Sequence, residues 1–207
     1  MVDDLLYYQQ KYDFTDVNFQ DETFFTYAKR MKGFAQGLIE AKTSFSWAGT
    51  MRADQGERLP DEVWKLCKDA GLRRLLIGVE SGSQEMMDWM KKDVKLTQVF
   101  YCADKCKELD IAVIFPFIVG FPEESDQSVS ETIKVVKKLR KASSKFDTPI
   151  FYFKPYPGSQ ITQDVVKNGY ELPKTTLDWG NFDYVGASGP WVTSKKERFF
   201  EHSKVGV

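Results

Sequence analysis

Short apolar runs alternate along the chain with longer stretches in which apolar residues recur every three or four positions. The clearest run is residues 75–79, Leu-Leu-Ile-Gly-Val, which is continuous rather than alternating. Such a run is typical of a parallel strand covered on both faces. The apolar run is followed directly by the polar residues Glu80 and Ser81 and by Gly82, which permits a tight turn. The pattern therefore predicts a buried strand that ends in a site.

The rest of the chain repeats this alternation of strands and helices. Residues 53–58 are expected to form a loop, and Gly71 to end a helix that starts at Pro60. Ser83 and Ser125 are in position to cap helices. The further strands are predicted at residues 12–19, 44–51, 111–119 and 149–153, and the helices at residues 2–10, 21–41, 60–70, 83–91, 97–109 and 125–140.

The polar ends of the predicted strands are spaced like successive strand-plus-helix units, roughly 28 to 40 residues apart. Right-handed crossovers of this length build an α/β fold with a parallel sheet or barrel, whose strand ends share one edge. Ligands bind at that edge in such folds. The side chains and loop expected to line a single cleft there are Asp16, Asn18, Arg52, Glu80, Ser81 and the loop at Gly120.

Composition and charge narrow the classes of function. A chain of 207 residues with a net charge of -1 is long enough for one α/β domain and carries no basic footprint for nucleic acid or anionic membranes. No apolar run approaches the roughly 20 residues that span a bilayer, and the first residues are not a secretory signal, so a cytoplasmic location is expected. His202 is the one histidine, which leaves little for a histidine-based triad or a zinc site.

Several candidates also have a purely structural interpretation. Glu80 can cap the following helix, and Arg52 can form a surface ion pair with Asp54 or Glu57. Asp16 and Asn18 can turn the chain through side-chain hydrogen bonds. The three cysteines do not form a disulfide framework, and unligated thiols are the favoured interpretation for the pair that lies four residues apart on a predicted helix; they are Cys67, Cys102 and Cys106.

Five segments, in this order and spacing, resemble the radical S-adenosylmethionine (SAM) superfamily. Within it, the chain looks most like the subgroup with an upstream cobalamin-binding domain, which includes the anaerobic magnesium-protoporphyrin IX monomethyl ester cyclase type. The resemblance covers residues 1–165 as one domain, and residues 166–207 are expected to form an irregular extension with a short helix from Ser194. The segments are residues 16–19, 47–52, 78–83, 117–124 and 155–159.

The resemblance implies a partial (β/α)6 TIM-like barrel that holds SAM and a [4Fe–4S] cluster. Reductive cleavage of SAM would release a 5′-deoxyadenosyl radical that abstracts hydrogen from a small-molecule substrate, with ring cyclisation or methylation of a tetrapyrrole-like compound as possible outcomes. A reductant such as flavodoxin or ferredoxin would supply the electron, and an upstream domain would bind cobalamin. No catalytic side chain and no metal ligand is assigned to this chain.

The resemblance also implies which residues contact SAM. Glu80 and Ser81 would meet its ribose or methionine part, and Arg52 its carboxylate, which suits a guanidinium fork. The backbone around Val119 and Gly120 would lie against the adenine. Asp16 and Asn18 would lie on the SAM or substrate side.

One departure from the family pattern is severe. The Cys-x3-Cys-x2-Cys loop that holds the cluster is absent, so the chain is expected to be a truncated catalytic domain that lacks the first barrel strand and is inactive alone. The alternative is a cluster-free barrel remnant that binds a nucleoside or another protein. A weaker alternative is a barrel hydrolase or aldolase with Glu80 as base and Lys154 as its lysine.

Overall fold

The computed structural model describes residues 1–180 and 189–192. Contacts divide the chain into two compact units, each considered by itself below. The first unit comprises Met1–Val79, Val94–Pro116 and Leu139–Thr148. The second comprises Glu80–Asp93, Phe117–Lys138 and the described residues from Pro149 onward. The predicted boundary at residue 165 stays a prediction, and the helix expected from Ser194 lies outside the described residues.

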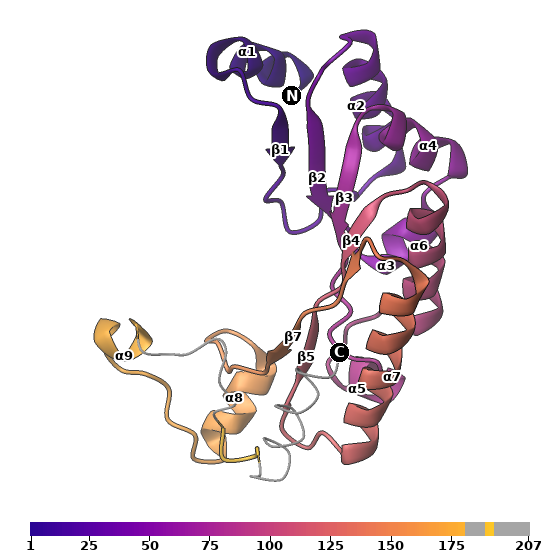
Figure 1. Cartoon of the computed structure of the whole chain (residues 1–207). Coiled ribbons are helices and arrows are strands. Elements are labelled where there is room, and N and C mark those ends of the chain that lie inside the picture. The colour runs from indigo at the N-terminus through magenta and orange to yellow at the C-terminus, as the bar shows by residue number, and fades with distance from the viewer. Residues whose placement is uncertain (181–188, 193–207) are drawn as a thin grey trace. The chain divides into compact units, whose positions relative to one another are not determined.

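The first unit is built on a parallel sheet of five strands whose order follows the chain. Its strands are β1 (Asp16–Asn18), β2 (Ser46–Thr50), β3 (Leu72–Leu76), β4 (Ala112–Ile114) and β6 (Phe146–Asp147). The crossover helices α2 (Ala28–Glu40), α4 (Asp61–Asp69) and α6 (Leu96–Glu108) lie along one face of this sheet (Figure 1). Helices α1 (Val2–Tyr12) and α3 (Ala53–Arg58) complete the unit. The predicted α/β class with a parallel sheet is confirmed.

The second unit holds a separate parallel pair of strands, β5 (Phe117–Val119) and β7 (Ile150–Tyr152). Its helices are α5 (Gln84–Trp89), α8 (Gln160–Lys167) and α9 (Thr176–Gly180), and α7 (Asp126–Ala142) contributes residues to both units. Ser125 caps α7 as predicted, because its Oγ accepts a hydrogen bond of 3.1 Å from the Ser128 N–H. None of the helices in the described ranges is long and apolar enough to cross a membrane.

Strand β3 of the first unit is covered on one face. Leu75 and Ile77 are fully buried, whereas Leu76, between them, is 40% exposed. This alternation follows from the strand pleat, since successive side chains point to opposite faces and the crossover helices cover one of them. The expectation of a strand covered on both faces is therefore wrong. A half-exposed apolar face remains, as in the interior of an incomplete barrel.

Aromatic side chains fill the core of the first unit. Trp47 is fully buried, and its indole N–H donates a hydrogen bond of 2.9 Å to the carbonyl of Ala70. Phe24, Phe25 and Phe34 surround its ring with centroid distances of 5.3 to 6.0 Å. These rings bury large apolar areas while the one polar atom of the tryptophan is satisfied.

Two predicted strands differ from the observed ones. The strand expected at residues 75–79 begins earlier, at Leu72, includes the arginine pair near its start and already ends at Leu76. The strand expected over residues 111–119 divides into β4 and β5 at Pro116, which has no N–H to donate to a neighbouring strand. The short strand β6 and the helices α8 and α9 were not predicted.

One predicted helix begins at a later residue, and one predicted loop is a helix. The helix expected from residue 21 begins at Ala28, because the preceding residues Phe24 and Phe25 turn into the aromatic core instead. The loop expected at residues 53–58 is the helix α3, in which Ala53 and Gly56 are buried. Small residues of this kind allow close packing, which a pattern of large apolar positions does not reveal.

Gly82 is required by a close backbone approach. A Cβ at this position would lie 2.5 Å from the Cα of Thr132 on α7, and the Gly82 N–H donates a hydrogen bond of 2.9 Å to the Thr132 hydroxyl. Real Cβ atoms do not lie so close to a backbone atom, so α7 would have to shift. Close packing of a helix, rather than the expected tight turn, explains the glycine.

Gly82→Ala is expected to lower the free energy of unfolding by roughly 1–3 kcal/mol, because the added methyl group overpacks a backbone contact. Urea unfolding followed by circular dichroism measures this. Gly33→Ala is the matched control, since nothing lies within 4 Å of its Cβ position inside α2. The control is expected to gain roughly 0.5–1 kcal/mol from helix propensity. Equal stability of Gly82→Ala and the parent would contradict the packing argument.

Candidate functional site

Glu80 has an unusual backbone conformation. Its φ is 67°, in the left-handed region that side chains other than glycine rarely adopt. Its carbonyl accepts a hydrogen bond of 2.7 Å from the Ile118 N–H, and its carboxylate Oε1 accepts one of 2.6 Å from Lys92 Nζ. Ser83, and not Glu80, occupies the N-cap position of α5, but contrary to the prediction its side chain makes no capping hydrogen bond. Six other non-glycine residues of the described ranges also have a positive φ, so this conformation does not by itself mark a functional site.

Ser81 faces the interior of the second unit. It is fully buried, its Oγ lies 3.3 Å from the Thr132 hydroxyl, and it accepts a hydrogen bond of 3.1 Å from the Ser83 N–H. These contacts fix the connection between Glu80 and α5 against α7. A contact between Ser81 and a ligand stays a prediction that its surroundings do not favour.

The turn at Gly120 is held by two side chains from outside it. Its φ is 80°, which suits glycine, and its N–H donates a hydrogen bond of 2.5 Å to the carboxylate of Glu124. The same carboxylate oxygen accepts a hydrogen bond of 3.3 Å from the Phe121 N–H. The Gly120 carbonyl accepts a hydrogen bond of 2.8 Å from the indole of Trp191. Val119, just before the turn, is fully buried.

Sequence reasoning missed both of these partners of Gly120. Glu124 follows the glycine by four residues, so the spacing of a carboxylate after a strand-ending glycine was an available signal. Its side chain is only 2% exposed, which is unusual for a carboxylate and shows that it serves the backbone of the turn. Trp191 is far away in the chain, and no local pattern indicates its contact.

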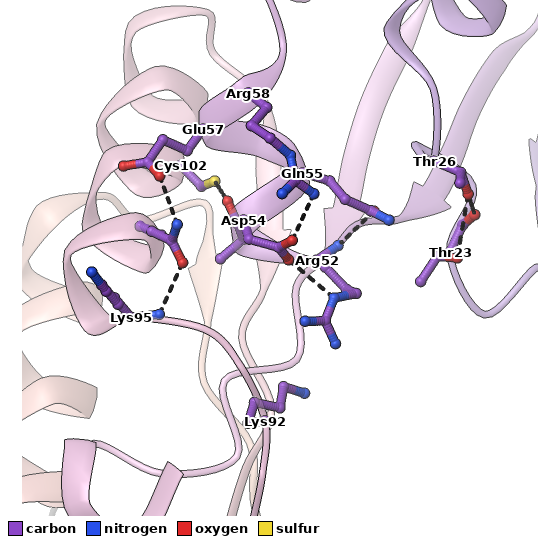
Figure 2. A network of polar contacts seen from close by, with 12 residues as sticks. Thr23, Thr26, Arg52, Asp54, Gln55, Glu57, Arg58, Lys92, Lys95 and Cys102 are labelled. Carbon is purple, nitrogen blue, oxygen red and sulfur yellow. Dashed lines mark hydrogen bonds and ion pairs between the residues drawn. The ribbon is translucent and has the colours of Figure 1, made fainter. Parts of the chain in front are cut away.

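Arg52 forms an ion pair that the sequence offered as its structural alternative. Its Nε lies 3.0 Å from one carboxylate oxygen of Asp54, and Arg58 approaches the other oxygen at 2.7 Å (Figure 2). Glu57 instead accepts a hydrogen bond of 2.6 Å from Gln98. The Arg52 side chain is 36% exposed and stands at the start of α3, directly after the end of β2. Its contact with a ligand carboxylate stays a prediction.

Asp16 lies at the wrong end of its strand for the predicted role. It is the first residue of β1, and its register partner Ser46 is the first residue of β2. Its carboxylate pairs with the guanidinium of Arg73, which lowers the pKa of Asp16, and accepts a hydrogen bond of 2.7 Å from the Ser46 hydroxyl. The expected position at the carboxyl edge is therefore wrong for Asp16. Asn18 ends β1 and does lie at that edge.

The second unit contains a pocket of about 600 Å³ next to Glu80. Glu80 and Lys92 line it together with Lys154, which is 7% exposed. Most of the other lining side chains are apolar or aromatic. A cavity of this size and composition, with a few converging polar groups, is typical of small-molecule sites.

The cysteines do not fit an iron–sulfur cluster. Burial raises the pKa of the Cys67 and Cys102 thiols to about 12 and raises that of Cys106 well above its ordinary value. Cys102 donates its thiol to the carbonyl of Ala53 at 3.4 Å (Figure 2). Within residues 1–180 and 189–192, no group of three or more histidine, cysteine or acidic side chains is arranged to hold a metal ion. The interpretation as unligated thiols agrees with these surroundings.

Comparisons with known proteins agree with the resemblance in the sequence. The family model of the radical SAM superfamily matches residues 5–136. The uncharacterized methyltransferase PH0819 of Pyrococcus horikoshii is 24% identical over 88% of the chain, which covers 38% of that protein.

Two solved structures share the fold. The cobalamin-dependent SAM radical enzyme OxsB matches 97% of the chain and 35% of its own, with a TM-score of 0.69 at 17% identity. The radical SAM methyltransferase TsrM from Kitasatospora setae, a structure with cobalamin and a [4Fe–4S] cluster bound, matches 80% of the chain and 30% of its own, with a TM-score of 0.67 at 13% identity. These likenesses show that the fold is that of a partial TIM-like barrel.

The three thiols are expected to be inert in the folded chain, because burial keeps them protonated and inaccessible. Titration with Ellman's reagent at pH 8 is expected to find no reactive thiol in the native protein. In guanidinium chloride, all three cysteines should react. Rapid reaction of any thiol under native conditions would contradict the buried arrangement.

Proposed function

Because the chain belongs to the radical SAM superfamily, we propose that it is the SAM-binding part of a radical SAM enzyme. The observation that carries the proposal is the geometry of Glu80. A carboxylate in a strained backbone conformation forms a parallel bridge with Phe117 of β5 and lines a pocket. The chain spans 38% of the length of PH0819, so the activity of the whole protein is part of the proposal.

The residues around Glu80 and Gly120 are suited to an adenosine. A partly exposed carboxylate accepts hydrogen bonds from ribose hydroxyls, and the side chain of Glu80 is 23% exposed. The turn at Gly120 is fixed by Glu124 and has no side chain that would obstruct a flat base. By the family resemblance, the backbone at Val119 and Gly120 is proposed to lie against the adenine, whereas contacts from Arg52 and Asn18 stay predictions from the sequence.

The iron–sulfur cluster is proposed to be held outside this chain. In the family it supplies the electron that cleaves SAM, but the three cysteines here are buried and protonated. We assign no cluster-dependent step to any residue of this sequence. The role that remains for the chain is to bind and orient SAM and the substrate.

The names of PH0819 and TsrM favour methylation as the reaction class. PH0819 is named as an uncharacterized methyltransferase, and TsrM is a radical SAM methyltransferase. OxsB is cobalamin-dependent, and TsrM has cobalamin bound. We therefore propose a cobalamin-associated methyltransferase as the parent activity. Ring cyclisation of a tetrapyrrole-like substrate rests on the resemblance in the sequence alone.

SAM is expected to bind this chain weakly through its adenosine, and Glu80→Gln is expected to weaken that binding about tenfold, the effect of a lost charge-assisted hydrogen bond. Saturation-transfer NMR detects such binding and shows which SAM protons lie against the protein. The adenine and ribose protons should receive the largest saturation. Glu85→Gln on α5 is the matched control, since Glu85 is exposed and lies outside the pocket.

The same titration tests the competing interpretation. If SAM gives no saturation, or if Glu80→Gln and Glu85→Gln bind it equally, the proposed SAM site is wrong. Equal affinity for adenosine and SAM, unchanged in Arg52→Ala, would instead support the nucleoside-binding module.

The isolated chain is expected to form no 5′-deoxyadenosine from SAM, because its cysteines do not hold a cluster. The chain is incubated anaerobically with iron, sulfide, dithionite and SAM, and the product is quantified by chromatography. A known radical SAM enzyme treated in parallel verifies the reconstitution. Product formation by the chain itself would overturn the conclusion that its residues do not support the cluster.

A further inference from the structure

Trp191 lies against the turn at Gly120 in the second unit. Its indole N–H donates a hydrogen bond of 2.8 Å to the Gly120 carbonyl, and Gly120 is buried. The rings of Phe153 and Tyr170 lie beside the indole, with centroid distances of 5.9 and 5.3 Å. A flat aromatic side chain therefore occupies the backbone edge that is proposed to lie against the adenine of SAM.

The indole group has the features by which an adenine would be held at this turn. Both are flat, fused five- and six-membered rings with an N–H donor at one edge, which in adenine is the exocyclic amino group. The N–H groups of Gly120 and Phe121 donate to Glu124, so the Gly120 carbonyl is the polar group of this glycine that a base can reach. A base that used this carbonyl and contacted the neighbouring rings would take the place of the indole. Because Gly120 is already buried, the indole and the base cannot occupy this place together.

The attachment of Trp191 is modest enough for a ligand to replace. Trp191 and Val192 are half-buried, and the Val192 N–H closes a short turn by donating a hydrogen bond of 2.9 Å to the Gly189 carbonyl. Val192 also packs against a buried cluster formed by Val119, Val129 and Tyr152. The hydrogen bond from the indole to Gly120 joins two neutral groups, which contribute less net stability than a charged pair. An adenine amino group that donates to the same carbonyl restores this hydrogen bond, so displacement of the indole leaves no buried acceptor unpaired.

We propose that Trp191 is an autoinhibitory side chain that occupies the adenine position, and that SAM binds by displacing it. The inference rests on the proposed function and adds the regulation of the same site. A ligand that binds only the open form has an apparent affinity reduced by the fraction of the chain in that form. A change that loosens Trp191 is therefore expected to tighten SAM binding, whereas loss of a side chain that supports the adenine would weaken it.

Substitutions in the full chain of 207 residues test the sign of this effect. Trp191→Ala is expected to raise the affinity for SAM roughly fivefold in a saturation-transfer NMR titration, because no side chain then has to leave. Trp191→Phe keeps a ring but loses the N–H donor, and a smaller increase is expected. Val192→Ala keeps the indole but weakens its anchor, so it is expected to increase the affinity as well. Leu177→Ala is the control, since this side chain on α9 is 76% exposed, and it should leave the affinity unchanged.

The indole N–H of Trp191 gives a direct readout that a purely structural role would not move. Its ¹H–¹⁵N correlation signal is assigned by its disappearance in Trp191→Phe. Saturating SAM or adenosine is expected to move this signal toward the shift of a solvated indole and to speed its exchange with water, because both carry the base that displaces the side chain. Methionine, which lacks the base, should leave the signal in place. An unchanged signal at saturation with SAM would overturn the inference.

The outcomes separate failure of this inference from failure of the proposed function. SAM binding that Trp191→Ala leaves unchanged would overturn the inference and leave the proposed function intact. Binding that Trp191→Ala weakens would also overturn it and would make Trp191 a residue that supports the base. SAM binding by Trp191→Ala but not by the parent chain would support both. Absence of SAM binding by both chains would overturn the proposed function and this inference with it.

Discussion

The hydrogen bond from the Ile118 N–H to the Glu80 carbonyl is the constraint around which the second unit is organised. At 2.7 Å it joins the chain that leaves the third strand to the start of β5 while Glu80 is in the left-handed conformation. The pocket depends on it too, because Ile118 and Glu80 both belong to its lining.

Buried polar contacts with the backbone hold the remaining loops of this unit. Thr132 accepts a hydrogen bond from the Gly82 N–H, and Glu124 accepts hydrogen bonds from the N–H groups of Gly120 and Phe121. Buried N–H groups without a partner are costly, so these side chains keep two loops in fixed conformations. Loops that are already rigid favour the binding of a small ligand, because less conformational entropy is lost when the ligand binds.

The chain belongs to the radical SAM superfamily, yet its cysteines are buried and protonated. The structure accounts for both observations. Membership of the superfamily follows from a match over most of the barrel, where apolar strands and strand-end residues define the fold. The thiols of Cys102 and Cys106 lie inward on α6, where they behave as small apolar side chains.

Local sequence determined the class of the fold. Apolar runs, the Ser125 cap and the spacing of strand ends indicated parallel strands with helical crossovers, because each signal acts within a few residues. Only the tertiary structure decided how those elements pack. Pro116 divides one expected strand into two, and the small buried residues of α3 gave no helical pattern in the sequence. Asp16 lies at the amino edge of the sheet, where it pairs with Arg73. The contact of Trp191 with Gly120 and the aromatic pocket depend on residues distant in the chain, so no local pattern could reveal them.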